Sequence, residues 1–189
     1  MGAFVLILVG VLGVQMELTT SLEAEVKKRQ FEEQRRIALE KALAIPLASG
    51  RVTLNNGRIG ISGSVLFSLN SDQLQPTGRQ LLKSLAGPLN AYLRARNELL
   101  MVSGFTDDRT VRESNSRFED NWELSAQRAL TVTRALITDG IPSSMVFAAA
   151  FGSEQPVASN AGVEGRSQNR RVEMAPVPKS AAATSTSHE

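Results

Sequence analysis

The chain has 189 residues, a net charge of +2 and no cysteine, and its one histidine is His188 near the C-terminus. This length suits a single domain with appendages, and the small net charge provides no basic field for nucleic acid. The lack of cysteine excludes disulfides and thiolate chemistry, and the position of His188 excludes Ser-His-Asp triads and histidine-based zinc sites inside the domain.

The chain opens with an uncharged aliphatic run over residues 3–14. A spanning helix needs about 20 apolar residues, whereas residues 3–16 would cover only about 21 Å of a hydrocarbon core about 30 Å thick. No Lys or Arg precedes the run and no small-residue cleavage site follows it cleanly, which argues against an efficient signal peptide. A short uncleaved anchor, an atypical signal sequence, the back half of a longer membrane helix and a buried core element stay open. We interpret residues 1–16 as a short membrane segment, and we expect the native product to start upstream or to insert beside a partner helix.

Residues 17–48 are rich in strong helix formers, and no Gly or Pro interrupts them before Pro46. Leu18, Leu22 and Val26 repeat every four residues, but sustained heptads are absent. We therefore interpret this segment as a charged helical linker, a solvated and semi-rigid spacer, with a coiled coil as the alternative.

Residues 49–176 carry alternating strand and helix patterns that end in a Pro-, Ala-, Ser- and Thr-rich tail over 177–189, which we expect to be disordered. Asn55-Asn56-Gly57 tolerates the positive φ angles of a tight turn and predicts a β-hairpin. The pattern predicts helices over 76–96 and 119–138 and strands over 51–54, 58–62, 61–67, 98–103, 145–151 and 170–175.

These elements follow the order βαβαββ and predict an α+β fold, a two-layer sandwich with helices on one face of a mixed sheet. Strands separated by helices are expected to pair through right-handed crossovers. Trp122, in the second long helix, is expected in the core rather than as a sugar-stacking platform.

Three sequence blocks occur in a recognisable order: G-F-T-D at 104–107, N-W-E-L-S-A-Q-R-A at 121–129 and N-R-R-V-E at 169–173. This order resembles the OmpA-like peptidoglycan-binding domain, over roughly residues 60–174. The N-W-E-L-S motif and the long loop before it resemble the MotB-like branch more than the outer-membrane porins. The family usually has His where this chain has Phe105.

An Asp and an Arg at one site can hold a ligand that carries both an ammonium and a carboxylate; the alternative is a surface charge and a solvated helix Arg. The resemblance implies the first arrangement, with diaminopimelate of the peptidoglycan stem as the ligand. Asp107 would accept from the ammonium, and the planar fork of Arg128 would bind the carboxylate. Thr106 and Asn121 would support the site and Arg171 would border it.

The segment before the last strand carries Asn169 and Arg170. These two residues either fix the preceding loop against the sheet or contribute to the site, and the sequence leaves both readings open.

The resemblance implies non-catalytic anchoring of a membrane complex to peptidoglycan, with a MotB-like stator subunit as one form of it. We expect no catalytic residue, metal site or cofactor, although carboxylate catalysis stays formally open. The alternatives are a stand-alone periplasmic or outer-membrane-associated anchor and, in another class, a peptidoglycan-acting enzyme. MotB-like subunits carry an ion-relaying Asp in the membrane helix, and residues 3–14 contain none.

The expected partners are peptidoglycan, the inner membrane, a MotA- or TolQ-like channel subunit and a second copy in a homodimer, without nucleic acid. The expected location is the inner membrane, single-pass, with the C-terminal domain in the periplasm. The basic cluster Lys27-Lys28-Arg29 conflicts with this, because the positive-inside rule would place its side in the cytoplasm. A cytoplasmic segment upstream would relieve the conflict, because the rule compares the two flanks of a span.

Overall fold

The computed structural model describes residues 2–68, 71–111 and 117–179, with side chains described from residue 15 onward. The chain divides into two compact units, Met1–Ala38 and Leu39–Glu189. The first unit contains the greater part of one long helix, and the second contains the sheet, the other helices and the buried core of the described chain.

The long helix α1 (Gly2–Ala42) is continuous through the charged segment. Leu18 and Leu22 are exposed, which fits a solvated spacer over this stretch. An i,i+4 ion pair of 3.2 Å joins Arg29 to Glu25, of the kind that adds a few tenths of a kcal/mol to an exposed helix. Among the described residues, no helix is both long enough and apolar enough to cross a membrane.

The end of α1 is part of the folded core rather than of the spacer. Leu39 and Leu43 are fully buried, and so is Pro46 in the short helix α2 (Ala44–Ala48). Burying a leucine side chain contributes roughly 1.5–3 kcal/mol. The folded unit therefore begins at Leu39, before residue 49 where the sequence pattern placed its boundary, and α2 packs against the first strand of the sheet and a long helix.

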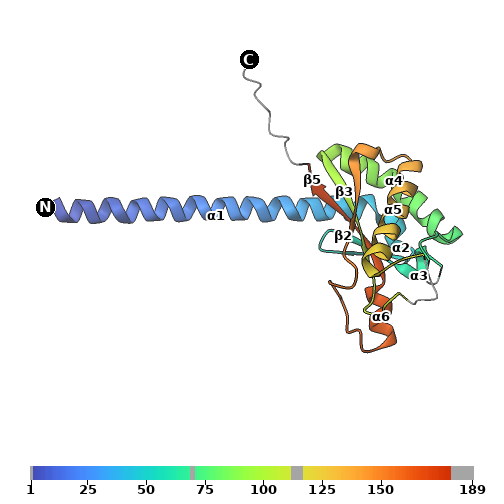
Figure 1. Cartoon of the computed structure of the whole chain (residues 1–189). Helices are drawn as coiled ribbons and strands as arrows, with labels where there is room; N and C mark the ends of the chain where they lie inside the picture. Colours follow the sequence, from blue (N-terminus) through green and yellow to red (C-terminus); the bar gives the residue numbers. More distant parts are fainter. Residues whose placement is uncertain (1, 69–70, 112–116, 180–189) are drawn as a thin grey trace, which may run out of the picture. The chain divides into compact units, whose positions relative to one another are not determined.

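One mixed sheet contains five strands in the order β1-β2-β5-β3-β4 (Figure 1). The neighbours β3 and β4 are parallel, and the other pairs are antiparallel. The predicted hairpin is confirmed, since Asn56 and Gly57 adopt φ angles of 51° and 74° between its strands. The strands are β1 (Val52–Asn55), β2 (Arg58–Ser62), β3 (Glu98–Phe105), β4 (Val146–Ala150) and β5 (Arg171–Pro178).

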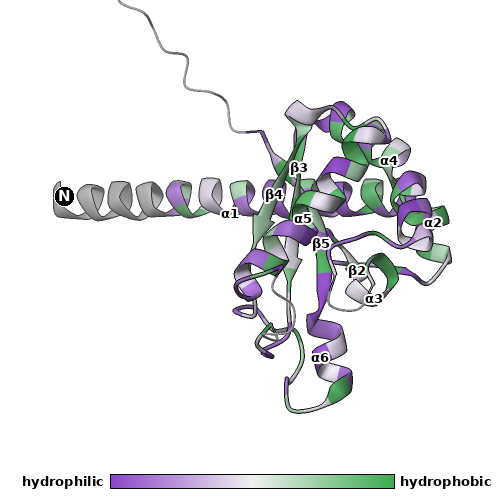
Figure 2. Cartoon of the chain, turned by 45° about the vertical axis from the view of Figure 1, so that its right-hand side comes forward, coloured by the Kyte–Doolittle hydropathy of each residue, from purple (hydrophilic) through white to green (hydrophobic). Residues whose placement is uncertain are grey.

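Two long helices, α4 (Pro76–Arg96) and α5 (Asn121–Thr138), pack next to each other and against the sheet (Figure 1). Hydrophobic and hydrophilic residues alternate around both helices, and the hydrophobic ones supply the core (Figure 2). The predicted α+β sandwich is confirmed. Leucines of α4 repeat on the buried face as expected: Leu81, Leu82, Leu85, Leu89 and Leu93.

The predicted strand over 61–67 is wrong beyond Ser62, where the chain turns into the short helix α3 (Gly63–Leu66). The amide of Gly63 donates to the carbonyl of Arg170 at 2.8 Å, and a Cβ on Gly63 would lie 2.9 Å from that oxygen. The apolar run fits a helical turn equally well, because Leu66 and Phe67 are both buried there.

The last strand occupies a position that the chain order does not predict. β5 lies between β2 and β3 and is antiparallel to both, so only β3 and β4, among the described strands, pair across a helix as expected. β5 also continues to Pro178, which pairs with Glu98, so residues 177–178 belong to the sheet. The rest of the predicted tail, from residue 180, lies outside the described residues.

Candidate functional site

The end of β3 and the start of α5 come together at one close contact. A Cβ on Gly104 would lie 2.1 Å from the carbonyl oxygen of Ser125, so only a glycine lets the helix approach the strand this closely. Thr106 and Asp107 directly follow β3, and Asn121 is the first residue of α5. The approach therefore places the strand end beside the first turns of the helix.

We expect Gly104→Ala to lower the free energy of unfolding by about 1–3 kcal/mol, because the new methyl group forces α5 away from β3. Urea denaturation of the full chain followed by circular dichroism measures this loss. Gly162→Ala is the matched control, since nothing lies within 4 Å of a Cβ there, and we expect a change below about 1 kcal/mol. Equal stability of the two variants would contradict the close packing.

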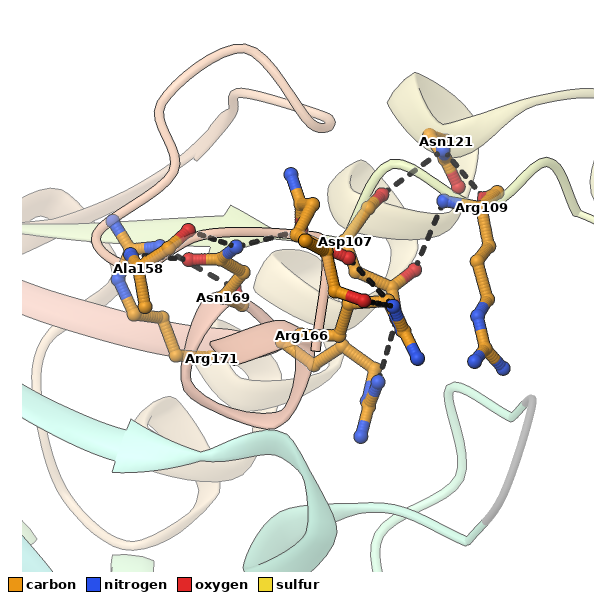
Figure 3. Close-up of polar contacts among 10 residues, drawn as sticks. Asp107, Arg109, Asn121, Ala158, Arg166, Asn169 and Arg171 are labelled. Carbon is orange, nitrogen blue, oxygen red and sulfur yellow. Dashed lines mark hydrogen bonds and ion pairs between the residues drawn. The ribbon is translucent and has the colours of Figure 1, made fainter. Parts of the chain in front are cut away.

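Asp107 is buried, with 7% of its surface exposed, and both carboxylate oxygens are bonded. Oδ2 accepts from Nη1 of Arg170 at 2.6 Å, and Oδ1 accepts from the backbone N–H of Arg109 at 3.3 Å (Figure 3). The side chain of Asn121 donates to the carbonyls of Asp107 (3.3 Å) and Arg109 (2.9 Å). These bonds fix the carboxylate and join its loop to α5.

Arg128 on α5 is also 7% exposed. Its Nε donates to the carbonyl of Ser71 at 3.0 Å, and its guanidinium lies 5.2 Å from the ring centroid of Phe67. Burial first, and the positive charge of Arg170 second, lower the pKa of Arg128 to about 10, although the carboxylates of Asp107 and Asp72 oppose the shift. Arg128 is thus a buried cation at neutral pH, and no direct ion pair joins it to Asp107 within the part of the chain described.

Thr106 lies between these groups and the sheet. Its backbone N–H donates to the carbonyl of Gly152 at 2.8 Å, while its buried hydroxyl has no hydrogen-bond partner among the described residues. A buried hydroxyl left unsatisfied costs about 1–3 kcal/mol. The Thr106 hydroxyl is therefore a buried polar group that the described chain leaves unsatisfied.

Arg171 contacts side chains of the sheet rather than the Asp107 carboxylate. Its guanidinium lies 3.8 Å from the ring centroid of Phe105, and its Nε donates to Glu173 at 2.6 Å. Phe105 stacks in turn on Phe151, with 5.0 Å between ring centroids. The aromatic residue at the position where the family usually has His is thus buried between a ring and a cation.

The contact of Arg170 with Asp107 was missed at the sequence level. Arg170 directly precedes β5, which begins at Arg171, and the two side chains diverge: Arg170 reaches Asp107, whereas Arg171 reaches Glu173. No local pattern in the sequence distinguishes which of the two arginines contacts Asp107.

Asn169 fixes the loop before β5, as one of the two readings expected. It is fully buried, and its Oδ1 accepts from the N–H groups of Val157 (2.8 Å) and Ala158 (3.0 Å) (Figure 3). Its amide nitrogen donates to the carbonyl of Ala158 at 2.8 Å and to Oδ1 of Asn160 at 2.7 Å. Every polar atom of the side chain is used inside the protein.

Comparison with known families decides the classification: residues 66–170 match the model of the OmpA family. The chain belongs to the OmpA family. It is 42% identical over 127 residues to motility protein B of Bacillus subtilis, a match that covers 67% of this chain and 47% of that protein. The chain therefore spans less than half the length of this relative, and the similarity favours the MotB-like branch of the family.

Solved structures of related proteins have the same fold. A putative MotB-like protein from Desulfovibrio vulgaris superposes with a TM-score of 0.66 at 28% identity, covering 80% of this chain and 98% of that one. The cell wall anchor of the T6SS from Pseudomonas aeruginosa gives 0.61 at 29% identity, covering 72% and 94%.

Trp122 of this OmpA-family domain is not a core residue, and that prediction is wrong. Its side chain is 49% exposed. The buried stripe of α5 runs through Leu124, Val132 and Leu136, and Trp122 lies at its flank in the first turn. Hydrophobicity alone suggested burial, whereas the direction in which the helix presents the residue decided against it.

The arrangement suits binding of a small zwitterion. A carboxylate and a guanidinium lie at one site with opposite charge, and an unsatisfied hydroxyl lies beside them. The N-terminus of α5 is capped within the protein, because the Asp120 carboxylate accepts from the N–H of Glu123 at 2.8 Å. Within the residues described, no three His, Cys, Asp or Glu side chains gather to hold a metal ion.

Proposed function

We propose that this OmpA-family domain binds peptidoglycan without cleaving it and anchors the chain to the cell wall. The observation that supports this most is the pair of buried, oppositely charged side chains, Asp107 and Arg128, at the junction of β3 and α5. Asp107 is already paired with Arg170, whereas no ion pair neutralises Arg128 within the described residues; a buried cation of this kind is costly, and it favours an anionic ligand over a purely structural role.

The ligand proposed is the amino-acid end of diaminopimelate in the peptide stem. Its ammonium would be accepted by Asp107, whose two oxygens retain lone pairs beside the bonds to Arg170 and Arg109. Its carboxylate would accept parallel hydrogen bonds from the guanidinium of Arg128. Within the described chain, the side-chain hydrogen bond of Arg128 uses Nε and leaves the two Nη groups for the ligand.

Three further residues shape the proposed site. Thr106 would offer its free hydroxyl, and Asn121 would hold the loop of Asp107 against the helix. Arg171 would border the site by fixing Phe105 and the start of β5.

Peptidoglycan sedimentation tests this proposal. We expect the full chain to bind sacculi that carry diaminopimelate at least about tenfold more tightly than sacculi that carry lysine, because lysine lacks the distal carboxylate. We also expect no soluble muropeptides in the supernatant after long incubation, since the described residues of the site include no cysteine, no histidine and no pair of free carboxylates.

The control is the same protein on diaminopimelate sacculi in the presence of excess free diaminopimelate, which should release it. Equal binding to both kinds of sacculi would contradict recognition of the distal carboxylate. Reproducible release of muropeptides, abolished by one carboxylate substitution, would place the chain among enzymes.

We further propose that the anchored complex lies in the inner membrane, with residues 1–16 beside a partner helix and the OmpA-family domain in the periplasm. A homodimer with a MotA- or TolQ-like channel subunit is the assembly that similarity to motility protein B favours. The similarity to a T6SS wall anchor supports anchoring outside motility as the second candidate. Co-purification from membranes distinguishes the two, because only the first retains a channel subunit.

A further inference from the structure

Trp122 is exposed but rigidly held. It is the one tryptophan of the sequence, and its indole atoms lie 3.4–3.5 Å from the place where a Cβ of Gly152 would stand. Gly152 itself has a φ of 51°, a backbone angle that residues with a side chain rarely adopt. The indole therefore rests on a backbone surface, and about half of it faces solvent.

The residue that supports Trp122 also belongs to the ligand site. The carbonyl of Gly152 accepts from the N–H of Thr106 at 2.8 Å, and its N–H donates to Oγ of Ser125 at 3.0 Å. Oγ of Ser125 donates in turn to the carbonyl of Trp122 at 2.9 Å. Gly152 thus connects the indole to the strand end that carries Asp107.

Helix geometry places Trp122 beside the charged site. Asn121, Ser125 and Arg128 follow at intervals of four and three and share one face of α5. Trp122 follows Asn121 by one residue, about 100° around the helix, so its exposed ring flanks that face. Trp122 precedes Arg128 by six residues, about 9 Å along the helix axis and about 120° around it. A ligand would therefore reach the indole past Thr106 and Gly152 rather than directly from Arg128.

We propose that Trp122 is the stacking platform for a sugar ring of the glycan strand, next to the diaminopimelate site; this rests on the function proposed above. The face of a pyranose presents C–H groups with partial positive charge, and the indole face is electron-rich. Two amino-acid residues and the lactyl group separate diaminopimelate from the pyranose ring, a span on the order of 10 Å at about 3.6 Å for each unit. A stem peptide seated at Asp107 therefore keeps its sugar within reach of the surface around the site.

The test compares two ligands that differ only in the sugars: a disaccharide–tripeptide that contains diaminopimelate, and the same tripeptide without sugars. We expect the full chain to bind both by calorimetry, and the disaccharide form about tenfold more tightly. The emission of Trp122, the one indole fluorophore, should shift or be quenched with the disaccharide form alone.

Substitution separates the stacking role from the fold. Trp122→Ala should remove the tenfold difference and leave the affinity for the bare tripeptide unchanged, and Trp122→Phe should retain part of it. Phe147→Ala is the matched control, because Phe147 is an exposed aromatic residue on β4, and it should alter neither affinity.

Three results would overturn the inference. Equal affinity of the wild-type chain for both ligands, or an equal loss for both in Trp122→Ala, would assign the indole to another role while the proposed function stands. If neither ligand binds the wild-type chain, the proposed function and this inference are both wrong.

Discussion

Asp107→Asn is expected to weaken binding of the free diaminopimelate tripeptide by at least about 30-fold. The substitution keeps the shape of the side chain and an oxygen for the N–H of Arg109 but removes the charge that attracts the ammonium. Removal of one partner from a buried, charge-assisted pair costs about 2–5 kcal/mol, which corresponds to this loss or more. Calorimetry with the full chain measures the affinity.

The loss must come from the site and not from unfolding. Asp107 also holds Arg170 at 2.6 Å, so some stability is lost with the charge, but the freed guanidinium is about one-third exposed and finds water. We therefore expect the variant to unfold in a single cooperative transition, close to the wild-type midpoint.

Asp108→Asn is the matched control for Asp107→Asn. Asp108 is adjacent in the chain but exposed, so the same change of charge should leave the affinity within a factor of about two. Equal binding by the wild type and Asp107→Asn would remove Asp107 from the site, whereas an equal loss in both variants would indicate a long-range effect of net charge.

The parts of the fold that the sequence predicted are those set by local chemistry. The apolar face of α4 repeats every three or four residues, and Asn56-Gly57 supplies a turn with positive φ angles. The position of β5 between β2 and β3 depends on which strand edges are free after the rest has folded. No local pattern encodes that choice, so the sequence did not predict it.

The candidate site, like the fold, was predicted from the sequence only in part. Blocks of residues made Asp107 and Arg128 the candidates, and the packing of β3 on α5 brings these segments together. The pairing of Arg170 with Asp107 and the exposure of Trp122 depend on the direction in which a side chain leaves its element. Composition and spacing identify the residue types at a site, but the three-dimensional framework decides which of them face the ligand.

Arg128→Met is expected to abolish binding of the tripeptide, with at least about a 30-fold loss of affinity, without destabilising the fold. Burial lowers the pKa of this guanidinium to about 10, so the folded state binds its proton less tightly than the unfolded chain does. At pH 7 the full penalty applies, about 3 kcal/mol, and stability should rise with pH only as the pH passes above about 10 towards the ordinary pKa of arginine.

Methionine removes that penalty with an unbranched apolar side chain of similar length. It also forfeits the bond to Ser71 and the contact with the ring of Phe67, which together contribute about 1–3 kcal/mol. We therefore expect the free energy of unfolding in urea at pH 7 to stay level or to rise by about 1–2 kcal/mol, as when other buried charges are replaced by apolar residues.

Two further variants make the Arg128 result decisive. Arg134→Met changes an exposed arginine on the same helix and should leave both the affinity and the stability within about 0.5 kcal/mol of wild type. Arg128→Lys keeps a charge but loses the planar fork, so it should remain weak in binding without the gain in stability. A loss of more than about 2 kcal/mol of stability in Arg128→Met would contradict this account, because it would make Arg128 a structural residue whose charge is already satisfied inside the protein.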